Sequence, residues 1–180
     1  MPYIDVPNVP GIRALLAFRP ETAEPLGALA HALLHAPNSL SPGDRELIAA
    51  YVSHLNQCRF CFESHAAIAA CHLHDEALVD LAVADPQAAP ISSKMRELLA
   101  LAARVQLSGR AVSPEDVARA KREGATDVEI HDTVLIAAAF CMFNRYVDGL
   151  GAVTPTDREA YRGRAAQTAL EGYRMTAPPA

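Results

Sequence analysis

Residues 46–65 read ELIAAYVSHLNQCRFCFESH, and this stretch holds reactive side chains at an interpretable spacing. Cys58 and Cys61 form a C-x-x-C pair, His65 follows the second cysteine by four residues, and Glu46 precedes the first by twelve. A thiolate forms at neutral pH with help from a base or a positive field, and a neighbouring thiol can capture its oxidised form. The pattern therefore indicates dithiol redox chemistry.

The spacing requires a turn between the glutamate and the cysteines. Residues three and four apart share one face of a helix, so Cys58, Cys61 and His65 form a stripe. On an unbroken helix Glu46 would lie about 18 Å from Cys58, at roughly 1.5 Å per residue. If Asn56 caps a new helix, the chain reverses there into two antiparallel helices. Glu46 lies ten residues before Asn56 and His65 nine residues after it, so the two side chains lie at about the same height. Cys58 then lies in the first turn, where free N–H groups favour a thiolate.

The rest of the chain also reads as helix, because alanine and leucine dominate and no sustained alternation of β-branched and polar residues occurs. Ser41, Ser113 and Thr154 are each followed by proline and a carboxylate, which is typical of a helix start, and Thr126 with Glu129 forms a capping box. We predict an all-α fold with helices at residues 22–36, 42–55, 57–72, 75–84, 92–107, 114–123, 127–147 and 155–173.

The chain has 180 residues, 51% of them hydrophobic, so it can bury a substantial core within one domain. We expect this domain to cover residues 1–180. Its parts are an N-terminal arm over residues 1–40, the C-x-x-C hairpin over 41–84 and a second helical half over 91–173. A linker at 85–90 contains two prolines, which disfavour helix.

The hairpin and the second helical half each contain a short segment of similar sequence. Residues 44–49 read DRELIA and residues 95–100 read MRELLA, which suggests a duplicated helical unit. The second copy has no C-x-x-C pair downstream of its glutamate, so the chemistry belongs to the first copy alone. The proline-rich tail at 177–180 is expected to be disordered.

Composition excludes several classes of protein. The net charge of −5 and the scattered Lys and Arg residues leave no electrostatic footprint for nucleic acid. The first residues lack the cationic start and apolar stretch of a signal peptide. The longest apolar run, at residues 134–143, is shorter than the ~20 residues of a membrane helix and predicts a buried core helix. We therefore expect a cytoplasmic protein with reduced thiols, which binds neither nucleic acid nor membrane.

Each residue of the group has a chemical role in this interpretation. One thiolate attacks an electrophilic oxygen or sulfur, and the second thiol resolves the resulting sulfenic acid or mixed disulfide. His65 accepts and returns the proton, while Glu46 orients and polarises the imidazole. The i,i+4 spacing to His65 favours Cys61 as the attacking thiol and Cys58 as the resolving one. A position at the helix N-terminus would instead activate Cys58, so both orders stay open.

Zinc binding is the main alternative, because Cys71, His72 and His74 could complete a tetrahedral set with the C-x-x-C pair. Structural zinc pairs usually sit on a knuckle or ribbon turn, whereas this pair is followed by helical sequence. We therefore expect no metal and no cofactor. Two further alternatives are a redox sensor that turns over slowly and a pair of thiols that simply fills a helix face.

Other polar side chains could border the group or pack in the core. They are His31, His35, Tyr51, His54, Cys71, Cys141, Asn144 and Arg145. His31 and His35 lie four residues apart on a predicted helix with no third metal ligand nearby, so we expect them at the surface or an interface. For Arg145 we favour a structural role, such as pairing with Asp148, over lining a pocket mouth.

Glu46, Cys58, Cys61 and His65 match E-x(11)-C-x-x-C-x-x-x-H, and this pattern resembles the signature of the alkylhydroperoxidase D-like branch of the carboxymuconolactone decarboxylase superfamily. The resemblance covers most of the chain. Over residues 92–151 the sequence is similar to the subgroup of peroxidase-related proteins. It implies an all-helical fold and a homo-oligomer, whether dimer, trimer or hexamer. The implied activity is reduction of a small hydroperoxide through a C-x-x-C disulfide, which a dithiol reductant or its carrier protein regenerates.

In the same resemblance, Cys58 and Cys61 are the redox pair, and His65 and Glu46 are the proton relay. One position departs from the pattern. The best-studied members carry a histidine directly before the second cysteine, where this chain has Phe60. The decarboxylases of the superfamily lack the cysteine pair, which disfavours lactone decarboxylation here.

Overall fold

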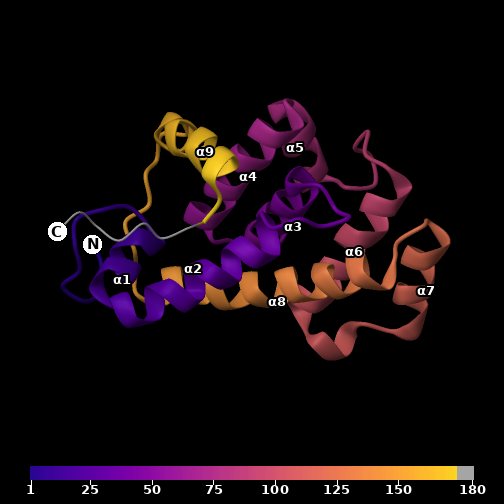
Figure 1. Cartoon of the computed structure of the whole chain (residues 1–180), viewed down its shortest axis with the longest axis horizontal. Helices are drawn as coiled ribbons and strands as arrows, with labels where there is room; N and C mark the ends of the chain where they lie inside the picture. The colour runs from indigo at the N-terminus through magenta and orange to yellow at the C-terminus, as the bar shows by residue number, and fades with distance from the viewer. Residues whose placement is uncertain (174–180) are drawn as a thin grey trace.

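The computed structural model describes residues 1–173, and regular secondary structure in this part of the chain is entirely helical (Figure 1). The all-α prediction is therefore confirmed, while the predicted disorder at 177–180 lies outside the described residues. The helices are α1 (Ile12–Phe18), α2 (Pro20–Leu34), α3 (Pro42–Leu55), α4 (Arg59–Leu73), α5 (Glu76–Ala84), α6 (Ser93–Leu107), the 3₁₀ turn η1 (Gly109–Ala111), α7 (Pro114–Arg122), α8 (Asp127–Gly149) and α9 (Glu159–Glu171).

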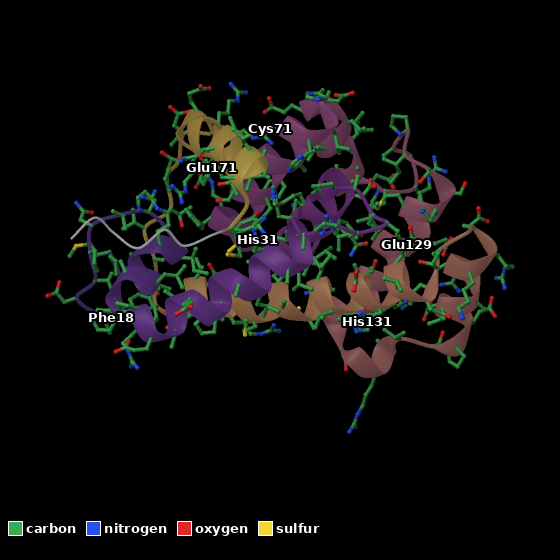
Figure 2. All side chains as sticks on the ribbon, viewed as in Figure 1. Phe18, His31, Cys71, Glu129, His131 and Glu171 are labelled. Carbon is green, nitrogen blue, oxygen red and sulfur yellow. The ribbon has the colours of Figure 1, made fainter. Side chains whose placement is uncertain are left out.

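Side-chain caps start several helices at the predicted residues. Ser41 caps α3, and Ser113 and Thr126 form capping boxes at the starts of α7 and α8. Each box satisfies two backbone N–H groups that a helix start leaves without partners. Glu129, the second member of the Thr126 box, also accepts a hydrogen bond from Lys94 of α6 at 2.9 Å and lies near α6 in Figure 2. The cap thus joins two helices.

Two predictions near the chain ends are wrong. Helix α1 was not predicted, because it has seven residues and no side-chain cap. It follows Gly11, whose φ of 62° and ψ of −145° belong to a region that residues with a Cβ avoid. Helix α9 begins at Glu159 and not at residue 155. The carbonyls of Pro155 and Thr156 accept hydrogen bonds from side chains instead of continuing a helix.

Helix α8 runs lengthwise across the molecule in Figure 1, below α3. Side chains such as Ile136 and Phe140 are buried on one face, as predicted for residues 134–143. The opposite face carries Leu135 and Met142, which are 39% and 44% exposed, so the helix is not buried all round. No helix within residues 1–173 has both the length and the hydrophobicity needed to cross a membrane.

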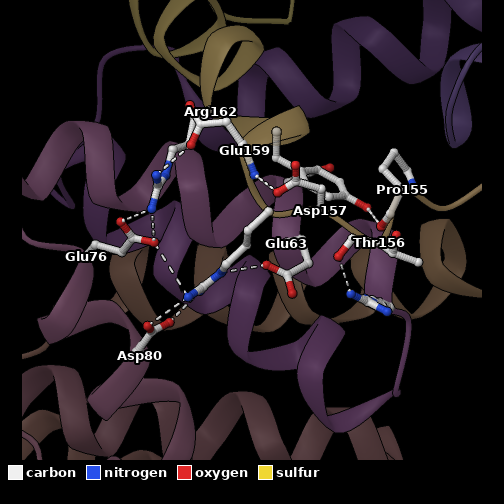
Figure 3. A network of polar contacts seen from close by, with 12 residues as sticks. Glu63, Glu76, Asp80, Pro155, Thr156, Asp157, Glu159 and Arg162 are labelled. Carbon is white, nitrogen blue, oxygen red and sulfur yellow. Dashed lines mark hydrogen bonds and ion pairs between the residues drawn. The ribbon is translucent and has the colours of Figure 1, made fainter.

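Charged side chains attach α9 to α4 and α5. The guanidinium of Arg158 contacts Glu63 at 2.9 Å and Asp80 at 2.6 Å, and Arg162 contacts Glu76 at 3.0 Å. Figure 3 shows these carboxylates gathered beneath the start of α9. A partly exposed ion pair contributes at most about 1 kcal/mol. Several such pairs on one helix nevertheless fix its position, and α9 covers the face of α4 that carries the cysteines.

Candidate active site

The turn between α3 and α4 brings the two ends of the sequence signature together. Gln57 adopts a left-handed conformation with φ of 60°, and the N–H of Cys58 donates to the carbonyl of Ser53 at 3.0 Å. This reversal lets α4 pack back along α3. As a result, Oε2 of Glu46 lies 2.7 Å from Nδ1 of His65. The structure therefore places the predicted carboxylate and imidazole in direct contact.

Asn56 ends α3 and does not begin α4, so its predicted role as N-cap is wrong. Its side chain instead joins a chain of hydrogen bonds behind the turn. Nδ2 of Asn56 donates to Asn144 at 2.7 Å, and Oδ1 of Asn56 accepts from Gln106 at 2.9 Å. Asn144 in turn donates to Oγ of Ser53 at 3.1 Å. These bonds tie the turn to α6 and α8.

Loss of this network should destabilise the fold. Asn144 is 1% exposed, so Asn144→Ala would leave buried partners unsatisfied. We expect the free energy of unfolding to fall by about 2 to 4 kcal/mol, measured by urea denaturation. The matched control is Arg145→Ala, because the exposed Arg145 hydrogen-bonds the Cys141 carbonyl of its own helix. The control should change stability by less than about 0.5 kcal/mol. Equal losses in both variants would contradict the assigned role of Asn144.

The two cysteines occupy the beginning of α4, and both are free thiols. Cys58 is the N-cap residue, just before the first turn in which we predicted it, and Cys61 is the third helical residue. Cys58 is fully buried and Cys61 is 5% exposed. Interaction with the neighbouring side chain of Cys61, together with burial, raises the pKa of Cys58. Cys58 therefore keeps its proton at neutral pH.

Tyr173 completes the polar group around Glu46 and His65. Its hydroxyl donates to Oε1 of Glu46 at 2.6 Å and lies 3.3 Å from Nδ1 of His65. Burial and the neighbouring charge of Glu46 raise the pKa of Tyr173 well above its ordinary value, so the hydroxyl remains a donor. A buried carboxylate is costly unless it is paired. Glu46, which is 1% exposed, thus has a partner for each oxygen.

Close packing on α2 sets the position of Tyr173. Its N–H donates to Nδ1 of His31 at 3.3 Å, and Figure 2 places His31 below the end of α9. The preceding Gly172 has φ of 73°, and a Cβ there would lie 2.5 Å from the His31 ring. His31 and His35 are half-buried, with ring centroids 5.0 Å apart. His31 is therefore not a free surface side chain, because it packs against the residues that follow α9, and an interface role for it stays a prediction.

A cavity of about 260 Å³ opens beside His65, between α1, α2, α4, α8 and α9. Cys61, His65 and Tyr173 contribute to its wall, whereas Cys58 and Glu46 lie behind the wall. Most of the remaining wall is apolar and includes Ile12, Leu16, Leu26, Ile68, Phe140 and Phe143. Concave, mainly apolar cavities with a few polar groups are typical of small-molecule sites. A ligand in this cavity meets Cys61 before Cys58.

Comparison with known proteins agrees with this geometry. A model of the carboxymuconolactone decarboxylase family matches residues 20–72, which contain the complete Glu, Cys, Cys and His group. The fold is also similar to the alkylhydroperoxidase AhpD core of an uncharacterized peroxidase-related protein from Ralstonia eutropha JMP134. That match has a TM-score of 0.78 and 26% identity, and it covers 88% of this chain and 82% of the other. The chain therefore resembles the alkylhydroperoxidase D-like branch of the carboxymuconolactone decarboxylase superfamily, in sequence over residues 20–72 and in fold.

A second solved member of this kind is an uncharacterized peroxidase-related protein from Silicibacter sp. TM1040. It matches with a TM-score of 0.77 and 26% identity, over 86% of this chain and 80% of the other. No curated protein matches the chain significantly. The comparisons therefore support a relationship to the alkylhydroperoxidase D-like proteins and a fold shared with peroxidase-related structures.

Phe60 is the position at which this chain departs from the best-studied alkylhydroperoxidase D-like proteins. Its ring lies 5.8 Å from that of Tyr161, measured between centroids, and forms part of the cavity wall. It also packs against Gly11, where a Cβ would come within 2.0 Å of the ring. Phe60 thus joins α4 to α9 and to the start of α1. An apolar ring cannot exchange protons, so Phe60 contributes packing and no acid or base to the cavity wall.

The remaining candidates lie outside the site. Within residues 1–173, no three His, Cys, Asp or Glu side chains are grouped to hold a metal ion. Cys71, His72 and His74 lie near the other end of α4, about 15 Å along the helix axis from Cys61 at ~1.5 Å per residue. The donor set required by the zinc alternative is therefore not assembled in the described part of the chain.

Three further side chains have packing roles. Tyr51 is half-buried against the core formed by α3, α6 and α8, and burial raises its pKa. His54 is exposed, and its ring meets the edge of Phe62 at 5.4 Å. The sulfur of Cys141 accepts a contact from Asn56 at 3.6 Å. These residues do not contribute to the cavity wall.

Proposed function

We propose that the protein is a thiol-dependent peroxidase that reduces hydroperoxides through Cys61 and Cys58. One observation carries this proposal: Cys61 and His65 share the wall of an apolar cavity, while Cys58 lies directly behind Cys61. Because Cys61 reaches the cavity and the buried Cys58 does not, we assign Cys61 as the attacking sulfur. The two peroxidase-related structural neighbours support a peroxidase-like role in general.

In the first step, His65 takes the proton of Cys61, and the thiolate attacks the terminal oxygen of the hydroperoxide. A sulfur–oxygen bond forms and the oxygen–oxygen bond breaks, so sulfur is oxidised to a sulfenic acid. The leaving alkoxide receives the proton from His65 and departs as an alcohol. The contact of Nδ1 with Glu46 orients the imidazole and leaves Nε2 for proton exchange.

In the second step, the thiol of Cys58 attacks the sulfenic sulfur of Cys61. A disulfide forms, the sulfur–oxygen bond breaks, and the oxygen leaves as water with the proton of Cys58. Cys58 and Cys61 are close neighbours at the start of α4 and interact with each other, as this step requires. A dithiol reductant then reduces the disulfide by exchange and is itself oxidised to a disulfide.

Rapid mixing of the reduced protein with equimolar peroxide, followed by mass spectrometry of its peptides, tests this proposal. We expect one Cys58–Cys61 disulfide for each peroxide consumed, with Cys71 and Cys141 unchanged. Unmodified cysteines, or oxidation confined to Cys71 or Cys141, would refute it. Steady-state turnover with a dithiol donor then separates a peroxidase from a redox sensor, because a sensor forms the same disulfide but is reduced slowly.

A further inference from the structure

Two arginines face the cavity from different helices. Arg13 on α1 and Arg164 on α9 both contribute to its wall, and both remain exposed at its rim. Within residues 1–173, neither guanidinium takes part in an ion pair or a hydrogen bond. By contrast, Arg162 on the same helix as Arg164 is paired with Glu76 at 3.0 Å. Among the residues that the structure describes, the two rim arginines are thus cations without a bound carboxylate.

These two cations act on each other. Partial burial, followed by the positive charge of Arg13, lowers the pKa of Arg164. The carboxylate of Glu171 offsets part of this repulsion, but it also accepts a hydrogen bond from Gln167 at 3.2 Å. Like charges at the rim of a low-dielectric cavity repel each other more strongly than they would in bulk water. An anion between them would remove this repulsion.

The rest of the wall defines what such an anion must carry. Apolar side chains such as Ile12, Leu16 and Phe143 line the space between the rim and the thiol of Cys61. A small inorganic anion would leave this apolar surface without a partner. A molecule with an apolar chain and an anionic end group would satisfy both the wall and the rim.

We propose that the cavity binds a hydroperoxide with a carboxylate at the end of an apolar chain, and that Arg13 and Arg164 hold this carboxylate at the rim. The guanidinium fork matches a carboxylate with paired hydrogen bonds, which a single ammonium group cannot provide. The apolar chain lies along the wall, and the peroxide group is presented to Cys61. This inference rests on the proposed peroxidase function and adds the substrate class.

Kinetics with a matched pair of substrates tests the inference. A long-chain fatty acid hydroperoxide and its methyl ester differ only in the charge that the arginines would bind. In the double variant Arg13→Met, Arg164→Met, we expect KM for the acid to rise at least tenfold, equivalent to about 1.4 kcal/mol, with kcat unchanged. KM for the ester should not change. The control is Arg110→Met, Arg145→Met, which removes two exposed charges outside the cavity wall and should leave both KM values unchanged.

Direct binding separates this inference from the proposed function. Titration calorimetry of the Cys61→Ser protein with decanoate and with decanol requires no chemistry. We expect decanoate to bind at least tenfold more tightly than decanol, and we expect the double arginine variant to lose this preference. Equal binding of the two probes, or a preference that survives in the double variant, would overturn the inference. A rise in KM for the dithiol donor alone would also overturn it, because the arginines would then serve the reductant.

The two failures are distinguishable. If the wild-type protein reduces no hydroperoxide yet binds decanoate through the two arginines, the peroxidase proposal fails and the anion site remains. If the acid and ester hydroperoxides are reduced with the same KM by the wild-type protein, the peroxidase proposal stands and the arginine inference fails.

Discussion

Cys61→Ser is expected to abolish peroxide consumption, with a loss of at least about 10³-fold in turnover. Cys61 is the thiol that contributes to the cavity wall, and serine supplies a hydroxyl that does not ionise at neutral pH. Cys58→Ser should behave differently, because it retains the attacking sulfur. That variant should consume one equivalent of peroxide and stop, with Cys61 trapped as a sulfenic acid. Peroxide consumption and chemical trapping of the sulfenic acid measure the two outcomes.

Matched controls for this pair are Cys71→Ser and Cys141→Ser, which remove thiols outside the cavity wall and should keep wild-type rates. Melting temperatures of all four variants show whether a loss of activity reflects unfolding. If the Cys61→Ser protein accumulates a sulfenic acid on Cys58 while the Cys58→Ser protein is inert, the order of attack is the reverse of the one proposed. Such a result would mean that the N-cap position of Cys58 determines which thiol reacts, and that the exposure of Cys61 to the cavity does not.

Local signals explain why the sequence predicts the hairpin well. Ser41 and Thr126 fix helix starts through bonds to backbone groups three residues away, so their effect is readable from a few neighbouring residues. The spacing of Glu46 and His65 about a turn is similarly local. Only the detail of the turn was predicted wrongly, because Asn56 is used by Gln106 and Asn144 from distant helices. The role of Asn56 is therefore determined by its hydrogen-bond partners in the folded protein and not by its intrinsic preference for helix N-caps.

The parts of the site that the sequence does not predict come from the chain ends. Tyr173 reaches Glu46 across 127 residues, and no motif or spacing marks it. Arg13 lies on α1, a seven-residue helix without a side-chain cap. Arg164 lies on α9, which begins four residues later than predicted and is positioned by charged contacts to α4 and α5. Such contacts form only in the folded protein, so they produce no periodic pattern in the amino-acid sequence.

His65→Ala is expected to lower the rate of Cys61 oxidation by about 10² to 10⁴-fold at neutral pH, the range for loss of a general base. Unlike the guanidinium groups of Arg13 and Arg164, the imidazole that shares the cavity wall with Cys61 can serve as a general base. Without it, the thiol must ionise unaided, so the midpoint of the pH–rate profile should move to higher pH and activity should partly recover there. Stopped-flow oxidation between pH 6 and about 9.5 measures this shift. The matched control is His54→Ala, an exposed histidine of α3 outside the cavity wall.

Glu46→Gln tests whether Glu46 and His65 act together in proton transfer or His65 acts alone. The amide preserves the volume and can still contact His65 and Tyr173, but it removes the carboxylate charge beside the imidazole. If Glu46 polarises His65, this variant should fall between the wild-type protein and His65→Ala, and its pH–rate profile should move in the same direction. Tyr173→Phe should have a smaller effect, because it removes one donor to the carboxylate and keeps the charge. A Glu46→Gln protein with the wild-type profile would mean that His65 acts alone and that the buried pair serves only to close the hairpin.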